Sequence, residues 1–330
     1  MSLFLPILKK NRLLDNIHMT ICNVGSRKKD SDDDYASRGW QIFAPNLSIY
    51  GFDADADACD EANIDLEIRQ VNWNEKHIPL ALGKEIESRT LYVTKNPICS
   101  SLYSPNIPYV KRLDGLSKLM NLDFSLEIKT TTLDHFCEEE CINEIDFLQI
   151  DVQGADLDVL QGSLKTLNCS TLAVQIEVEF SPLYNNQPLF ADVDTFLRKY
   201  DFSLFDIAPS YRLRENLPIC SDKRSGQLLW GDAFYLRDLL REDINEHLKS
   251  PEKMLKLACI ADLMSFTDYS LEILVYLTRQ NGEDPSYNFA NSIIETLAQF
   301  SYLVDHGLES LPVVQQMRDY ASNLHLYTNK

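Results

Sequence analysis

The chain has 330 residues, of which 45% are hydrophobic and 25% charged, and its formal net charge at pH 7 is −19. A chain of this length can bury a substantial core and has room for one large α/β domain with an appendage. The negative charge argues against a nucleic-acid partner, because phosphate binding needs concentrated Lys and Arg. No apolar run is long enough for a membrane span. These limits favour a small-molecule or carbohydrate partner.

Residues 1–19 place a short apolar patch before basic residues, the reverse of the order in a secretory signal. We therefore expect an N-terminal arm or lead-in helix there. The eight cysteines include no Cys-x-x-Cys pair, and several lie within apolar segments. Scattered thiols of this kind are typical of reduced cysteines, which predicts a cytoplasmic protein.

The apolar pattern of residues 20–240 predicts strands that alternate with helices, the order of a mostly parallel sheet with an antiparallel edge. We expect strands at residues 20–24, 47–52, 78–82, 89–94, 127–133, 147–152, 171–180, 202–207 and 228–236, and helices at residues 54–63, 134–141 and 192–200. Residues 241–330 instead repeat their apolar positions at helical spacing, which predicts a helical C-terminal extension able to join subunits.

Residues 147–162, FLQIDVQGADLDVLQG, are the most informative segment. The pattern predicts a buried strand that ends at Asp151 and turns at Gly154 into an amphipathic helix. Ligands of parallel sheets bind at the carboxyl ends of the strands, so Asp151 is a candidate site residue. The other interpretation is that Asp151 stabilises a local turn.

Two further positions concern a nucleoside cofactor. Asp53 follows the strand at 47–52, where an acid can accept hydrogen bonds from ribose hydroxyls or cap the next helix. The first strand leads to Gly25 without the G-x-G-x-x-G spacing that wraps a diphosphate. S-adenosylmethionine has no phosphate, so one close approach at Gly25 would be enough for it.

The strand at 171–180 carries Glu177 and Glu179 on one face near its end. Together with Asp151 they are the candidate catalytic carboxylates. One of them could act as the base for a hydroxyl acceptor, or two could hold a divalent metal ion that lowers the pKa of that hydroxyl. A network of structural hydrogen bonds is the third interpretation of the glutamates.

Several motifs, in this order, resemble the FkbM-type methyltransferases, which use S-adenosylmethionine: GFDADADAC, LALG, TLYVTKNPICSSLYSPN, DFLQIDVQGADLDVLQG and VQIEVEF. The resemblance implies a Rossmann-like fold and O-methylation of a sugar, a glycan or a small metabolite. It also implies cofactor contacts from Asn23, Gly25, Ser26, Asp53, Ala54, Leu82 and Asp151, and substrate contacts from Ser100, Ser101 and Tyr103.

One departure concerns the first loop. Asn23 stands where the resemblance predicts an acid, and a charged run replaces a glycine-rich turn up to residue 34. This predicts weakened cofactor binding. The alternatives to an O-methyltransferase are a non-catalytic binding module with a degenerate cofactor loop and a nicotinamide-dependent oxidoreductase.

Overall fold

The computed structural model describes residues 2–27, 39–217, 219–244, 246–303 and 307–327. These residues form two compact units. The sheet unit holds the described residues of 20–33 and 48–238, and the helical unit holds those of 1–19, 34–47 and 239–330. Domain limits at residues 20 and 240 stay a prediction. Among the described residues, no helix has both the length and the apolar character needed to cross a membrane.

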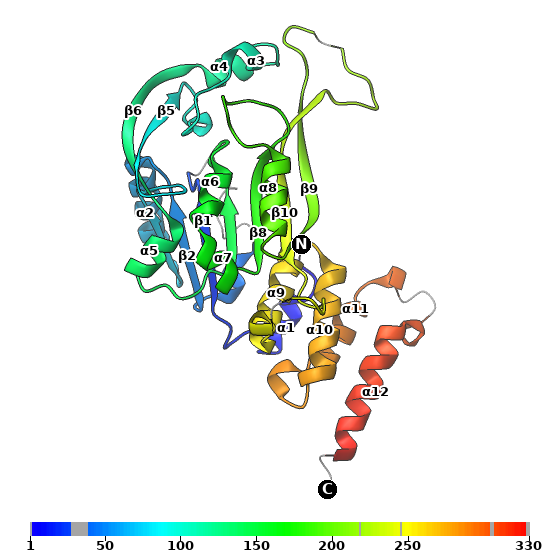
Figure 1. Ribbon diagram of the computed structural model, residues 1–330. Coiled ribbons are helices and arrows are strands. Elements are labelled where there is room, and N and C mark those ends of the chain that lie inside the picture. The colour runs from blue at the N-terminus through cyan, green and yellow to red at the C-terminus, as the bar shows by residue number, and fades with distance from the viewer. Residues whose placement is uncertain (1, 28–38, 218, 245, 304–306, 328–330) are drawn as a thin grey trace. The chain divides into compact units, whose positions relative to one another are not determined.

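Within the described residues, the main sheet has seven strands in the order β3-β2-β1-β7-β8-β10-β9 (Figure 1). Parallel pairs join β1 to β7, β7 to β8 and β2 to β3, whereas β10 runs antiparallel to both β8 and β9. This confirms the Rossmann-like, mostly parallel sheet with an antiparallel edge. The strands are β1 (Met19–Val24), β2 (Leu47–Phe52), β3 (Asn74–Ile78), β7 (Phe147–Ile150), β8 (Ala173–Glu179), β9 (Phe202–Arg212) and β10 (Gln227–Arg237).

Four helices cover one face of this sheet, on the side nearest the viewer in Figure 1. Phe136, Val159 and Leu197 pack there against the strand residues Leu148 and Ile176 in one buried cluster. The helices of the sheet unit are α2 (Ala56–Arg69), α3 (Ile107–Val110), α4 (Leu116–Met120), α5 (Leu133–Glu139), α6 (Asp156–Gln161), α7 (Leu164–Cys169) and α8 (Phe190–Arg198), and α5 to α8 form the cover.

A smaller sheet corrects one prediction. Residues 78–82 are not one strand, because β3 ends at Ile78 and residues 81–82 form β4 in a different, three-stranded sheet of order β4-β6-β5. Pro79 explains the break, since proline lacks the N–H that a continuing ladder would use. The other strands of this sheet are β5 (Ser88–Thr94) and β6 (Leu122–Thr131), which begins before the predicted residue 127.

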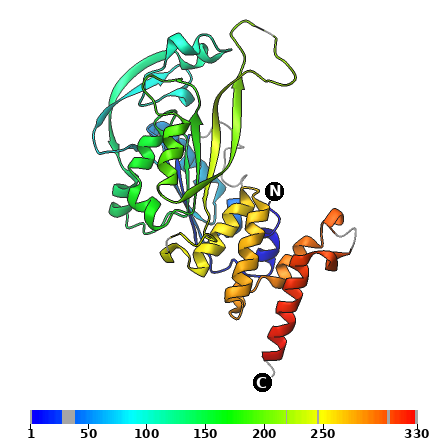
Figure 2. The same ribbon diagram turned by 45° about the vertical axis from the view of Figure 1, so that its right-hand side comes forward.

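In the helical unit, the N-terminal helix α1 packs beside α9 and α11 of the C-terminal region (Figure 2). The buried carboxylate of Asp262 accepts hydrogen bonds from the backbone N–H groups of Leu3, Phe4 and Leu5 at 2.9–3.0 Å. A side chain of α9 thus satisfies the first N–H groups of α1. The predicted helical C-terminal region is confirmed, with α9 (Pro251–Leu263), α10 (Thr267–Asn281), α11 (Ala290–Leu297) and α12 (Pro312–Tyr327); the other helix of this unit is α1 (Leu5–Lys10).

Arg237, at the end of β10, is buried at 2% exposure. Its guanidinium donates to the carbonyl oxygens of Thr171 and Tyr200 at 2.7 Å, donates to Leu167 O, and lies 4.3 Å from the ring centroid of Phe202. Burial lowers its pKa to about 10, so the group remains charged at neutral pH. One side chain therefore joins β8, α7 and the start of β9.

We expect Arg237→Met to lower the free energy of unfolding by about 3 kcal/mol, because it leaves buried carbonyl oxygens without donors. Arg198→Met is the control, because its side chain is 55% exposed and pairs only with Asp194 across one helical turn. That exposed pair contributes about 0.5 kcal/mol. Urea denaturation of both variants measures the difference, and equal midpoints would contradict the structural role of Arg237.

Candidate active site

The sheet unit contains a cavity of about 400 Å³ at the carboxyl ends of β1, β2 and β7. This is the edge at which the sequence predicts ligand binding, and the volume suits a small molecule. The predicted site residues in its lining are Gly25, Asp53, Ala54, Leu82, Ser100, Ser101 and Asp151. Five other predicted site residues lie outside the lining: Asn23, Ser26, Tyr103, Glu177 and Glu179.

The first loop of the cavity is pressed against the strands on either side. Gly25 has φ 87°, and a Cβ at this position would lie 1.9 Å from the carbonyl oxygen of Asp151. The N–H groups of Gly25 and Ser26 donate to Phe52 O at 2.8 and 2.9 Å, and Asp151 N donates to Val24 O at 2.9 Å. Only glycine fits this conformation and spacing. Backbone rather than side chains therefore forms this part of the wall.

Asp53 lines the cavity. The alternative interpretation, that Asp53 caps the next helix, is wrong. Asp55 caps α2, because its Oδ1 accepts from the N–H groups of Asp57 and Ala58 at 3.0 and 3.2 Å. Asp53 Oδ1 accepts from Asp55 N at 2.8 Å, and Asp55 also pairs with Arg27. Burial raises the pKa of Asp53, while the hydrogen bond from Asp55 N and the charge of Arg27 oppose this rise.

Gln153 joins the predicted acidic residues, and the sequence analysis missed it. Its Nε2 donates to Asp151 Oδ1 and to Glu177 Oε2, both at 2.7 Å, and its Oε1 accepts from Tyr184 OH at 3.0 Å. Ser101 Oγ donates to Gln153 O at 2.6 Å. The available signal in the sequence was the position of Gln153 directly before Gly154, in the turn that follows the strand-end acid. In the structure, Gln153 and Gly154 both have positive φ.

Three carboxyl groups near this turn have a raised pKa: the buried Asp156 and Glu179, and the half-buried Glu177. Asp156 accepts from Val152 N and Gly154 N at 2.9 Å, and burial raises its pKa to about 7. Burial also raises the pKa of Glu177 and of Glu179 well above the usual range, and neighbouring carboxylates add to the rise. Glu179 is 4% exposed, and its Oε1 has no hydrogen-bond partner among the described residues. A buried carboxyl in this environment favours its protonated form.

Asn23 and Ser26 lie next to the first loop but outside the lining. Asn23 is 8% exposed, and its Oδ1 has no hydrogen-bond partner among the residues that the structure describes. Ser26 Oγ lies 3.0 Å from His77 Nδ1, and His77 Nε2 lies 3.2 Å from Glu75 Oε1. This buried chain ties the loop to β3. Residues 28–34, the rest of the unusual charged loop, lie outside the described residues.

Tyr103 is directed to a different set of partners. Its hydroxyl donates to Asp158 Oδ2 at 3.1 Å, and the guanidinium of Arg89 lies 5.6 Å from its ring centroid. Burial and the nearby carboxylate of Asp158 raise the pKa of this phenol. Tyr103 thus stabilises the segment that carries Ser100 and Ser101, which do line the cavity.

An apolar wall completes the cavity. Two cross-strand pairs of β5 and β6, Leu91 with Leu126 and Val93 with Phe124, belong to the lining. Phe124 is 53% exposed and Leu126 41% exposed, which is unusual for paired apolar residues unless a ligand covers them. The alternation of apolar residues in LDFSLE was the signal in the sequence. Among the described residues, no group of three or more His, Cys, Asp or Glu is arranged to hold a metal ion.

The profile of the Methyltransferase FkbM domain matches residues 36–204. The 2-O-methyltransferase NoeI of Sinorhizobium fredii is 31% identical over 100 residues, which are 30% of this chain and 36% of that protein. The chain thus matches about a third of the length of this curated relative.

Two solved structures are similar at low sequence identity. Methyltransferase FkbM from Methylobacillus flagellatus is 10% identical, with a TM-score of 0.37 over 66% of this chain and 43% of that one. TrmK of M. capricolum, in complex with S-adenosyl-homocysteine, is also 10% identical, with a TM-score of 0.33 over 94% of this chain and 95% of that one.

The buried carboxyl groups predict a pH dependence of stability. A glutamate has a pKa of about 4.3 in the unfolded chain, so above this pH the unfolded state loses a proton that folded Glu179 retains. Stability is therefore greatest below the unfolded pKa and falls as pH rises towards the raised folded pKa. We expect Glu179→Gln to raise the free energy of unfolding near pH 8 by more than about 1 kcal/mol.

Thermal unfolding between about pH 5 and about pH 8 measures this effect. The decrease in Tm over this range should be smaller in Glu179→Gln than in the wild type, with a remainder from Asp156 and Glu177. The exposed Glu61 provides the control, since Glu61→Gln should leave the decrease unchanged. Equal pH profiles for the wild type and Glu179→Gln would contradict the buried, protonated state.

Proposed function

Because the chain belongs to the FkbM methyltransferase family, we propose that it methylates a hydroxyl group of a sugar, a glycan or a small metabolite. Family membership implies S-adenosylmethionine as the cofactor, and when bound it supplies a methyl group already activated for transfer. The observation that carries the proposal is that the strand-end acids Asp53 and Asp151 line the same cavity as Gly25.

The residues of the cavity fit this cofactor. Gly25 leaves a surface without a side chain, so a ligand can approach the backbone of the first loop. Asp53 presents a carboxylate able to accept hydrogen bonds from ribose hydroxyls, and Ala54 and Leu82 add apolar contact. Asn23 and Ser26 would support the loop. Asn23 Oδ1, which has no hydrogen-bond partner among the described residues, offers an acceptor for a cationic amine.

We assign to Asp151 the role of the base that removes the proton of the acceptor hydroxyl. Asp151 lines the cavity, and Gln153 Nε2 holds its Oδ1 at 2.7 Å, so the carboxylate has a fixed orientation. A base within hydrogen-bond reach and an aligned acceptor are the two requirements for this transfer. Glu177 shares Gln153 and would position Asp151, whereas Glu179 would act through the electrostatics of the buried cluster. A divalent cation on these carboxylates is the alternative for activating the hydroxyl.

The match to a 2-O-methyltransferase supports a hydroxyl group as the methyl acceptor. Ser100 and Ser101 would bind acceptor oxygens, and Tyr103 would order their segment. The eight cysteines, all of which lie in the described residues, form no disulfide bonds, and this supports our placement of the protein in the cytoplasm, since oxidising compartments favour disulfides.

Cofactor binding is tested by titration calorimetry. We expect Asp53→Ala to weaken S-adenosylmethionine binding by about 10- to 100-fold, because hydrogen bonds to a carboxylate are lost. Asp55→Asn is the control, since Asn also caps helices well and should retain most of the affinity. NAD should give no heat. Heat with NAD alone, or equal affinity in the wild type and Asp53→Ala, would refute the assignment.

Methyl transfer is tested with a radiolabelled methyl donor and a panel of sugars and metabolites. We expect Asp151→Asn to reduce transfer by about 100-fold or more, because a general base contributes this much, while circular dichroism stays unchanged. Asp57→Asn changes another carboxylate of the same lining and should keep full activity. Full activity in Asp151→Asn would exclude the base role, and loss of wild-type activity with a chelator would favour the metal alternative.

A further inference from the structure

The loop between β9 and β10 differs in charge from the rest of this acidic chain. Residues 111–114 and 212–224 carry six Lys or Arg and three Asp or Glu, whereas the whole chain has 31 and 50. Lys111 and Arg112 belong to this set because Asp114 N donates to Leu213 O at 3.0 Å and Glu215 N donates to Arg112 O at 2.9 Å. We call residues 111–114 with 211–226 the basic hairpin. Its cations are Lys111, Arg112, Arg212, Arg214, Lys223 and Arg224.

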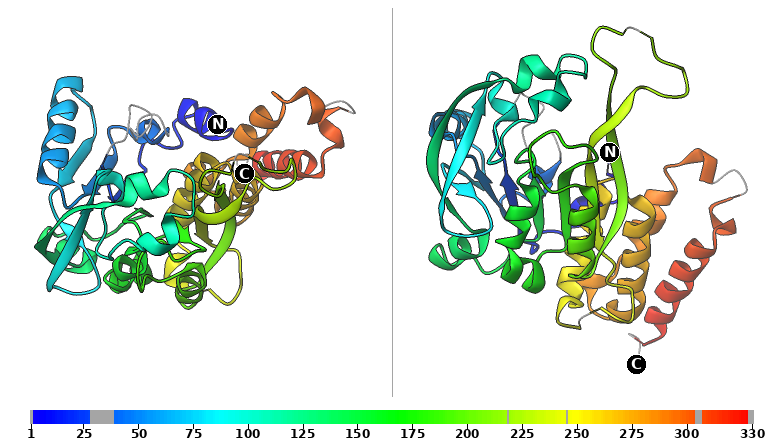
Figure 3. Two further views of the ribbon diagram at one scale, coloured as in Figure 1. Left: turned by 90° about the horizontal axis from the view of Figure 1, so that it is seen from above. Right: turned by 45° about the horizontal axis from the view of Figure 1, so that its top comes forward.

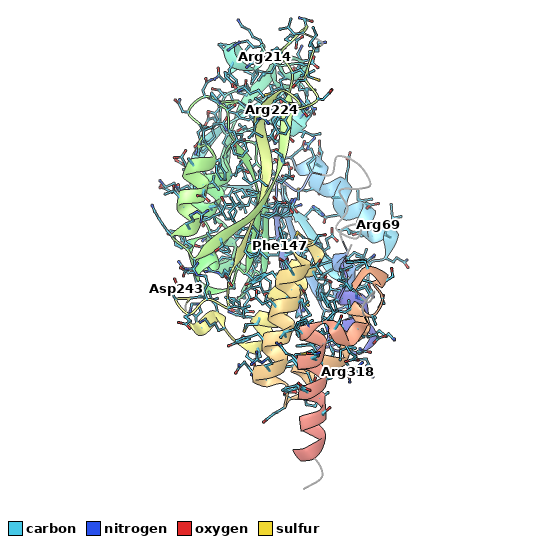
Figure 4. All side chains as sticks on the ribbon, turned by 90° about the vertical axis from the view of Figure 1, so that its right-hand side faces the viewer. Arg69, Phe147, Arg214, Arg224, Asp243 and Arg318 are labelled. Carbon is cyan, nitrogen blue, oxygen red and sulfur yellow. The ribbon has the colours of Figure 1, made fainter. Side chains whose placement is uncertain are left out.

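Within the part of the chain that the structure describes, these cations have no carboxylate partner at ion-pair distance. Arg212 stacks on Trp230, with 4.9 Å from its guanidinium carbon to the ring centroid, and Glu215 accepts from Gly115 N at 3.0 Å. Figure 4 labels Arg214 and Arg224 on one side of the sheet unit, away from Phe147 at the start of β7. The hairpin therefore presents a local excess of positive charge.

Large apolar side chains lie between these cations. Ile219 is 88% exposed, the highest value among the large apolar side chains that the structure describes, and Leu217 is 60% exposed. Both line a shallow hollow of about 390 Å³ together with Arg212, Arg214 and Arg224. Exposed apolar groups next to unpaired cations are typical of surfaces that bind a partner with both anionic and apolar parts.

The hairpin is fixed at its base and extends beyond the sheet (Figures 1 and 3). Gly226 has φ 123°, and a Cβ there would lie 2.4 Å from Arg212 O, so the two ends of the loop meet closely. Because β10 is antiparallel to both β8 and β9, the end of β9 at Arg212 lies on the same sheet edge as Asp151 and Glu179. The hairpin and the cavity thus occupy one edge of the sheet.

We propose that the basic hairpin binds the surface of a membrane that contains anionic lipids. Its Arg and Lys side chains pair with lipid phosphates, and Leu217 and Ile219 enter the boundary between head groups and acyl chains. The net charge of −19 does not prevent this contact, because at physiological salt charges are screened beyond about 8 Å. A nucleic acid would pair with the cations but would offer no apolar layer for Ile219.

Sedimentation of the full chain with vesicles tests the proposal. We expect the protein to sediment with vesicles of phosphatidylcholine and phosphatidylglycerol, to stay in solution with phosphatidylcholine alone, and to dissociate as salt rises. Lys223→Gln and Arg224→Gln should each weaken binding about fivefold, the effect of one cation near such a surface. The double variant Leu217→Ser with Ile219→Ser should weaken it about tenfold or more.

Ile68→Ser is the matched control, because Ile68 is 75% exposed on α2 and lies outside the basic hairpin, so its loss should not change sedimentation. Absence of sedimentation with the anionic vesicles would overturn the proposal. It would also be overturned if the double serine variant bound as the wild type does while a short RNA competed with the vesicles, since this would show a site for polyanions without an apolar component.

Discussion

The close approach of Gly25 to the backbone of Asp151 is the constraint on which the candidate site depends. A Cβ at residue 25 would overlap the carbonyl oxygen of Asp151, so the first loop can pack against β7 only because its side chain is absent. The N–H groups of the same loop donate hydrogen bonds to Phe52 O at the end of β2. Three strand ends are thereby held together, and the acids that follow β2 and β7 line one cavity.

Burial of carboxyl groups gives this site its electrostatic character. Asp156, Glu177 and Glu179 lie in surroundings that raise their pKa. Backbone N–H groups donate hydrogen bonds to Asp156, and the Gln153 amide donates one to Glu177. Desolvation of these groups costs stability at neutral pH, because it disfavours their charged forms. The hydrogen bonds that they accept fix their orientation. Asp151, which lines the cavity, therefore has neighbouring carboxyl groups whose protonated forms are favoured.

The sheet edge combines two surfaces of opposite character. The cavity joins acidic groups to the apolar pairs of β5 and β6, whereas the basic hairpin joins unpaired cations to exposed Leu217 and Ile219. The basic hairpin lies at this edge because β9 is antiparallel to β10, which is itself antiparallel to β8, so β9 ends on the same side of the sheet as β7 and β8. If the hairpin binds a membrane, an acceptor carried at that surface would meet the edge that holds the cavity, which links the two proposals without making one depend on the other.

The sequence by itself determined the sheet, its antiparallel edge and the strand-end acids, because apolar periodicity and the position of a residue after a strand are local properties. It did not reveal that β3 covers residues 74–78, since the polar residues of an edge strand carry little signal. It also left open which of the acids at 53, 55 and 57 caps α2. Gln153, the pairing of Ser26 with His77, and the cavity lining of Leu91 and Phe124 were decided only by tertiary structure. Each depends on which distant segments meet, and a hydrogen bond or a cross-strand contact leaves no periodic pattern in either segment alone.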